Sequence, residues 1–188
     1  VLFRSRHGQP EGWPKPAAAH TLAAFLPLDA AIMKSIDTWL AEYSDSHRNP
    51  VNKRLHWLCV PPIVVTVFGF LRAIPAGDAL INAATVAGVL TLVYYALLSW
   101  RLMLGLVPVT ILVLVLVQAS FAALGVLHLP LMAGIFVLAW IGQFVGHRVE
   151  GKKPSFFKDI QFLMIGPLWL LADVYRRLHL PLTAPTPN

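Results

Sequence analysis

The chain has 188 residues, of which 57% are hydrophobic and only 13% are charged, and its mean hydropathy is +0.66. A soluble domain of this size needs more charge to cover its surface, and between Asp78 and Glu150 only Arg101 and Arg148 are charged. The net charge of +6 does not indicate nucleic-acid binding, because the basic residues flank apolar runs, as they do on one face of a membrane protein. The single cysteine, Cys59, excludes an internal disulfide and any Cys-rich metal site.

The two ends of the chain differ from the region between them. Residues 1–32 contain "RHGQPEGWPKPAAAH", which is rich in Pro and Gly and has no hydrophobic period, so we expect disorder there. The chain does not begin with Met, and Met33 opens the first coherent helix, so we interpret 1–32 as an extension outside the native fold. We expect one membrane-embedded domain over 33–180 and a disordered tail over 181–188.

The first predicted element is a short amphipathic helix, "MKSIDTWLAEYSDSH", at residues 33–47. Its apolar side chains recur at helical spacing and form one stripe, which predicts a helix lying along a membrane surface. Asn49 and Pro50 then predict a new helix start, with Asn as the cap and Pro at the first helical position. The stripe consists of Ile36, Trp39, Leu40 and Tyr43.

Four apolar runs long enough to approach a membrane span follow, at residues 55–74, 79–98, 102–127 and 131–146. Pro61 and Pro62 are expected to bend the first run or to end a helical turn before it. "PAGD" at 75–78 predicts a tight connection, and "HLP" at 128–130 predicts the turn before the fourth run. The fold class is therefore an all-α polytopic membrane protein.

The last apolar segment, residues 160–178, is interrupted by Gly166-Pro167 and ends in Arg176 and Arg177. If it crossed the membrane, these two arginines would lie on the side opposite to the other basic loops. We therefore expect four transmembrane helices plus a re-entrant or interfacial C-terminal helix, with both termini cytoplasmic.

Polar residues from distant parts of the chain are expected to meet at the cytoplasmic edge. His47 and His56 precede or open the first span, and Asn52 shares a helix face with His56. Gln143, His147 and Glu150 form a polar stripe at the end of the fourth span. Imidazole and carboxylate groups are suitable ligands for iron, zinc or manganese, and ionisable groups within membranes tend to be functional. The sequence therefore predicts a metal site there.

A structural role remains open for each of these residues. A lone histidine at a membrane interface often anchors or caps a helix, and a polar stripe can hold helices together without chemistry. On that interpretation the protein would be a small transporter or a lipid-binding scaffold with no enzymatic activity.

Three stretches in order, "WLAEYSDSHRNPVNKRLHWLCVPP", "WIGQFVGHRVEGKKP" and "DIQFLMIGPLWLLADV", resemble the family of 2-hydroxy fatty acid dioxygenases. The fungal member of this family acts in the breakdown of phytosphingosine to odd-numbered fatty acids. The resemblance covers about residues 36–175. It implies an Fe(II)-dependent membrane enzyme that uses O2 to release C1 of a 2-hydroxy fatty acid as CO2, leaving a fatty acid one carbon shorter.

The resemblance also implies roles for individual residues. His47, His56 and His147 would bind the iron, and Glu150 would be either a further ligand or an acceptor that orients a histidine. Apart from the resemblance, the basic side chains near the site could pair the substrate carboxylate, or they could serve only as anchors to the phosphate groups of the membrane. The substrate-binding candidates are Asn52, Lys53, Arg54, Gln143 and Arg148.

The host membrane would be the bacterial inner membrane or the endoplasmic reticulum, with the site on the cytoplasmic side. Another metal-dependent lipid oxidase or hydroxylase is the alternative enzyme. The histidine clusters of di-iron hydroxylases are missing from the sequence, which argues against a di-iron centre.

Overall fold

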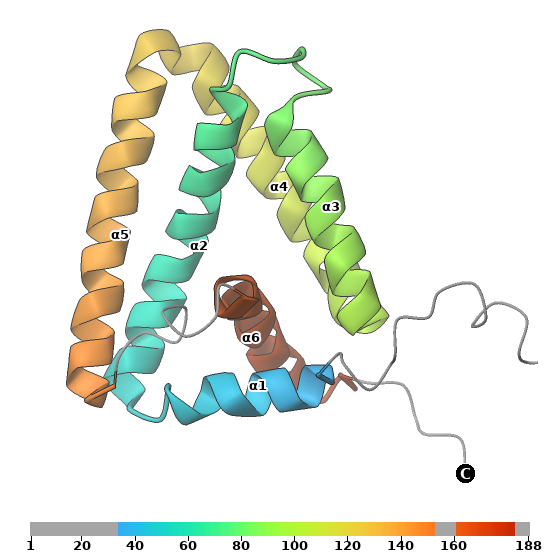
Figure 1. Cartoon of the computed structure of the whole chain (residues 1–188), viewed down its shortest axis with the longest axis vertical. Helices are drawn as coiled ribbons and strands as arrows, with labels where there is room; N and C mark the ends of the chain where they lie inside the picture. Colours follow the sequence, from blue (N-terminus) through green and yellow to red (C-terminus); the bar gives the residue numbers. More distant parts are fainter. Residues whose placement is uncertain (1–33, 153–160, 183–188) are drawn as a thin grey trace, which may run out of the picture. The chain divides into compact units, whose positions relative to one another are not determined.

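The computed structural model describes residues 34–152 and 161–182, and its helices belong to one compact unit, Ser35–Asn188. All regular elements in the described residues are helical, which agrees with the predicted all-α class (Figure 1). The predicted extension 1–32 lies outside the described residues, as does most of the predicted tail 181–188. In chain order the elements are α1 (Ile36–Asp45), α2 (Pro50–Arg72), α3 (Ala83–Leu98), α4 (Trp100–Leu124), the short 3-10 helix η1 (Gly125–Leu127), α5 (His128–Glu150) and α6 (Gln161–Arg177).

Helix α1 buries the predicted apolar stripe against α6. Trp39 meets Phe162 edge to face, with 5.1 Å between the ring centroids. The indole N–H of Trp169 on α6 donates to the hydroxyl of Ser44 at 2.9 Å. Burial of these side chains supplies the hydrophobic free energy that holds α6 on α1. The buried residues of α1 are Ile36, Trp39, Leu40 and Tyr43.

Helices α2 and α5 run side by side in opposite directions and form the most extensive helix pair (Figure 1). Asn49 caps α2 as predicted, accepting from the backbone N–H of Val51 at 2.8 Å, and Pro50 is the first helical residue. Glycines on α5 permit the close approach, because a Cβ at Gly142 would lie 2.5 Å from Cys59 Sγ and one at Gly146 would meet Asn52 Oδ1. The two helices are therefore tightly packed at the end that carries the predicted histidines.

Prolines do not interrupt the helices where the sequence predicted that they would. Helix α2 continues through Pro61 and Pro62, and α6 continues through Pro167. Each proline lacks one N–H donor, and the neighbouring helices can hold the segment helical despite that loss. Of the two outcomes predicted at Pro61-Pro62, a bend or a helix end, the helix end is therefore wrong, and the predicted interruption at Gly166-Pro167 is wrong as well.

One predicted turn is displaced, and one predicted connection is longer than expected. The chain reverses at η1, where Gly125 has φ +51°, and His128 already begins α5. "HLP" is therefore the first turn of a helix and not a loop. The connection between α2 and α3 is longer than "PAGD", because the Asp78 carboxylate accepts from the backbone N–H groups of Leu80 and Ile81, and Asn82 caps α3.

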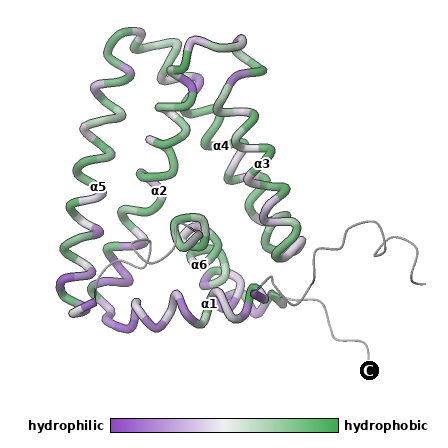
Figure 2. The backbone as a smooth tube through the Cα atoms, viewed as in Figure 1, coloured by the Kyte–Doolittle hydropathy of each residue, from purple (hydrophilic) through white to green (hydrophobic). Residues whose placement is uncertain are grey.

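Two described segments are long and apolar enough to cross a membrane: Pro50–Arg72 and Trp100–Glu150, the second comprising α4, η1 and α5. Helix α3, with 16 residues, is apolar but shorter. Hydrophobic residues cover α2 to α5, whereas hydrophilic residues gather along α1 and the adjoining ends of α2 and α5 (Figure 2). Large apolar side chains on these helices are exposed, among them Leu90 at 63%, Leu112 at 57% and Leu138 at 70%.

Candidate metal centre

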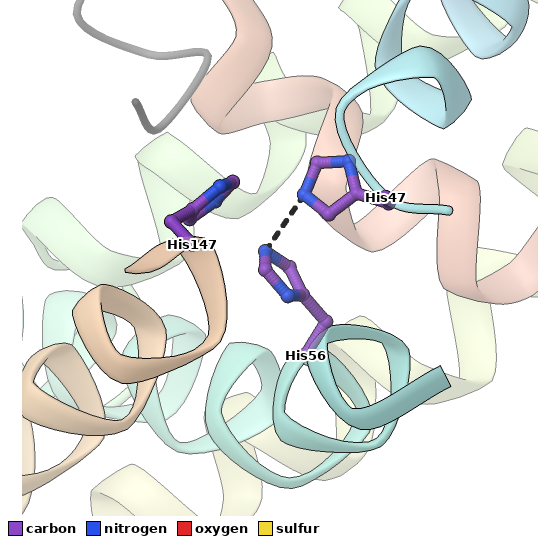
Figure 3. A group of neighbouring side chains, drawn as sticks. All are labelled: His47, His56 and His147. Carbon is purple, nitrogen blue, oxygen red and sulfur yellow. Dashed lines mark hydrogen bonds between the residues drawn. The ribbon is translucent and has the colours of Figure 1, made fainter. Parts of the chain in front are cut away.

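Three histidines from separate parts of the chain meet in the described structure. His47 lies in the loop between α1 and α2, His56 in α2, and His147 in the last turn of α5. Their side chains are buried, with exposures of 1%, 1% and 4%. The candidate ligand nitrogens all lie within 4.8 Å of one another, and the three rings point toward a common centre (Figure 3). The structure thus brings together the three histidines that the sequence singled out.

Backbone carbonyls determine which nitrogen faces that centre in two of the rings. The Nδ1–H of His47 donates to the carbonyl oxygen of Tyr43, and that of His56 donates to the carbonyl oxygen of Asn52 at 2.9 Å. A neutral ring that donates from Nδ1 carries its lone pair on Nε2. The two Nε2 atoms face each other at 2.9 Å, so two lone pairs point into the same space. A cation between them would relieve this repulsion.

Aromatic rings enclose His47. Tyr43 stacks on it with 4.1 Å between centroids and an angle of 11° between planes, and Trp169 lies 5.4 Å away. Burial lowers the pKa of His47 to about 4, although the hydrogen bond to Tyr43 acts in the opposite direction. His47 is therefore neutral near pH 7, which is the form that binds metal ions.

The carboxylate of Glu150 lies at the start of α2. Among the described residues, the group that could hold a metal ion consists of the three histidines and does not include Glu150. Its two oxygens accept from the backbone N–H of Arg48 at 2.9 Å, from that of Asn49 at 2.8 Å and from Asn52 Nδ2 at 3.1 Å. An acidic group at a helix N-terminus also interacts favourably with the helix dipole. Glu150 therefore links the end of α5 to the loop that carries His47.

Asn52 and Gln143 are buried beside the histidines. Asn52 donates to Ser46 O at 3.2 Å in addition to Glu150, which places it inside the same network. Gln143 is 5% exposed, and its Nε2 has no hydrogen-bond partner in the described structure. The Nδ1 of His147 likewise lacks one. Buried polar atoms without partners are costly, so both atoms are free to bond to a ligand or a water molecule.

Unlike Asn52 and Gln143, the basic residues predicted to bind substrate are not buried beside the histidines. The side chains of Lys53, Arg54 and Arg148 are exposed, and none of them lines the cavity beside the histidines. Tyr43 was predicted only as part of the apolar stripe and Trp169 had no predicted role, yet both side chains contact His47. Tyr43 lies four residues before His47, and this helical spacing could have predicted their contact. No sequence pattern linked Trp169 to the site.

A cavity of about 540 Å³ opens from the histidines. Its walls come from all six α-helices or the loops that adjoin them, and they are largely apolar. This size lies within the ~300–1,000 Å³ that is usual for small-molecule sites. His47, His56, Gln143 and His147 all line it. The arrangement can therefore hold a metal ion at the side of an apolar binding space.

The chain is similar to known proteins along most of its length. The family model described as 2-hydroxy-palmitic acid dioxygenase Mpo1-like matches residues 33–178. The chain is 30% identical over 141 residues to the 2-hydroxy-palmitic acid dioxygenase MPO1 of Saccharomyces cerevisiae, covering 74% of this chain and 79% of the yeast protein. No solved structure matches it. The family model spans the whole helical region that carries the three histidines, and the chain belongs to the 2-hydroxy-palmitic acid dioxygenase Mpo1-like family.

Proposed function

We propose that the protein is an iron-dependent membrane dioxygenase that oxidises 2-hydroxy fatty acids. The reaction would convert R–CH(OH)–COOH and O2 into R–COOH, CO2 and H2O. The bond between C1 and C2 breaks, C2 is oxidised from an alcohol to a carboxyl group, and O2 accepts the four electrons. The balance closes without a further reductant. The observation that carries the proposal is the buried group of His47, His56 and His147 at one end of an apolar cavity.

The donor set fits a transition metal. His47 and His56 present Nε2 lone pairs toward the same point, held there by Nδ1–H bonds to backbone carbonyls. Such outer hydrogen bonds orient histidine ligands and raise their basicity. Imidazole suits iron, zinc, copper and nickel, so the choice of Fe(II) rests on the oxygen chemistry of the family. When bound, the iron would supply the redox chemistry that activates O2.

Residues of the chain would bind and orient the substrate. The unpartnered amide N–H groups of Gln143 are suited to donate to the carboxylate or the 2-hydroxyl group. Tyr43 and Trp169 cover the face of His47 and exclude water from it. Burial in a dry site strengthens each of these polar interactions.

We further propose that α2, α3, α4 and α5 cross the membrane, with α1 and α6 at the histidine end. The exposed apolar side chains along these helices support this arrangement, since in water such a surface would be costly. Helix α3 would extend about 24 Å at ~1.5 Å per residue, which requires local thinning of the bilayer. The basic residues Lys53, Arg54, Arg148 and Lys152 lie at the ends of α2 and α5 near the histidines, which under the positive-inside rule supports a cytoplasmic position for the site. The host would be a bacterial inner membrane or the endoplasmic reticulum.

The test is metal content together with product formation. The protein would be purified anaerobically in detergent and reconstituted with Fe(II), as wild type and as His47→Ala, His56→Ala and His147→Ala. His128→Asn is the matched control, because His128 is also buried but bonds to Ser120 and to the carbonyl of Gly69 at the far end of α2. We expect near-stoichiometric iron in the wild type and the control, iron loss in the three variants, and conversion of 2-hydroxyhexadecanoic acid only where iron is bound. A folded wild type that binds no iron would overturn the proposal in favour of a scaffold.

A further inference from the structure

The cavity beside the histidines is chemically polarised. Its polar lining residues other than tyrosine and threonine are Gln143 and the three histidines, and all four lie at the same end. None of the described residues that line it is charged. Toward its other end the walls are apolar, with Phe68 and Leu71 from α2 and Leu116 from α4. The cavity thus has one end suited to a polar head and a long remainder suited to hydrocarbon.

Helix α2 gives the length of this space. His56 and Phe68 both line it, and they lie about 18 Å apart along the helix at ~1.5 Å per residue. The tail of an ordinary membrane lipid fills one leaflet, about half of a hydrocarbon core ~30 Å thick. A tail with its head at the histidines would therefore extend most of the way to Phe68, and a longer tail would meet it.

Helix α3 contributes a wall at that far level. A Cβ at Gly88 would lie 3.5 Å from the ring of Phe68 and 3.4 Å from the methyl group of Thr110 on α4. Its neighbour Ala87 lines the cavity, and its side chain is one methyl group. The adjacent Val86 is 50% exposed and does not line the cavity. The width of the far end therefore depends on a small residue at position 87.

We propose that this cavity holds the acyl tail of the substrate, and that its far end at Phe68 and Ala87 limits the length of tail that is accepted. The inference rests on the proposed function, because it takes the histidine end as the place of the reacting head. The occupant follows from the lining, since a long apolar space binds hydrocarbon more favourably than water. The unpartnered Nε2 of Gln143 gives the carboxylate a donor at the entrance to that space. The protein is therefore selective for long tails that fill the cavity.

The test measures tail-length preference by binding and by turnover. The full chain in detergent would be titrated with decanoic and hexadecanoic acids, which lack the 2-hydroxyl group and report binding alone. 2-Hydroxydecanoic and 2-hydroxyhexadecanoic acids would report turnover. The variant is Ala87→Phe, which places a ring in the far end. Val86→Phe is the matched control, and Ala87→Leu is a milder variant that retains the fold if Phe does not.

For Ala87→Phe we expect hexadecanoic acid to bind about tenfold more weakly or worse, because at least two methylene groups are displaced, with decanoic acid within about twofold of wild type. Val86→Phe should match the wild type for both acids. If a folded Ala87→Phe or Ala87→Leu protein had the wild-type ratio of affinities for hexadecanoic and decanoic acids, the proposal would be overturned, even if the enzyme were active. A shifted binding ratio in a protein that binds no iron would support the acyl site while the dioxygenase proposal failed.

Discussion

Glu150 accepts a hydrogen bond from the backbone N–H of Asn49 at 2.8 Å, although 101 residues separate them in the chain. The same carboxylate accepts from Arg48, the residue after His47. The end of α5 carries His147, and through Glu150 it also holds the loop that carries His47. From this relationship we predict that Glu150 acts as a positioning residue.

Replacing Glu150 by Ala should loosen the His47 loop and weaken iron binding about 10- to 100-fold, the usual effect of removing a group that orients a metal ligand. Glu150→Gln keeps one acceptor oxygen, so its iron affinity should lie between those of Glu150→Ala and the wild type. Iron titration followed spectroscopically would measure both. If instead Glu150→Gln lost all iron while unfolding at the wild-type temperature, the carboxylate would be a metal ligand.

Gly146→Ala should destabilise the protein by about 1–3 kcal/mol, because the added methyl group meets Asn52 Oδ1 and pushes α5 from α2. Since His147 is the next residue, iron affinity should fall as well. Gly134→Ala is the control on the same helix, where an added Cβ meets nothing within 4 Å. It should be neutral or stabilise by about 0.5–1 kcal/mol. Denaturant unfolding in detergent measures both, and equal effects at the two positions would contradict the packing argument.

Tyr43→Phe should retain the fold and the iron, because the stacked ring and the backbone carbonyl that accepts from His47 both remain. Tyr43→Ala should lower stability by about 3–5 kcal/mol through the lost core packing and should weaken iron binding. Thermal unfolding and metal content separate the two variants. A Tyr43→Phe protein that keeps its iron but loses turnover would assign the hydroxyl a catalytic role.

His128→Ala should cost about 1–3 kcal/mol, since it removes two buried hydrogen bonds, although the Ser120 hydroxyl keeps its bond to the Val117 carbonyl and the Gly69 carbonyl keeps its bond from Ala73 N–H. Iron stoichiometry should not change, because His128 lies at the opposite end of α2 from His56. Unfolding in denaturant alongside metal analysis checks this. Loss of iron in this variant with the fold intact would show that the two ends of the helix pair are coupled.

Much of the helical arrangement was predictable from local patterns. The apolar stripe of α1 and the Asn49-Pro50 start of α2 follow from helical periodicity and capping chemistry, which depend on neighbouring residues alone. The effect of Pro61, Pro62 and Pro167 was not predictable in the same way, because helix continuity there depends on neighbouring helices. The turn at Gly125 was misplaced for a related reason, since "HLP" has local turn chemistry but His128 bonds to the carbonyl of Gly69 on α2.

The sequence by itself determined the all-α class, the Asn49-Pro50 start of α2 and which three histidines to expect together, because periodicity, capping and the cost of polar groups in apolar surroundings are local properties. Only the tertiary structure decided that His47 and His56 oppose their Nε2 atoms, and that Glu150 bonds to the start of α2. It also placed Tyr43 and Trp169 around the site and opened a long cavity beside it. These features arise from packing between segments up to about a hundred residues apart, which no local pattern encodes.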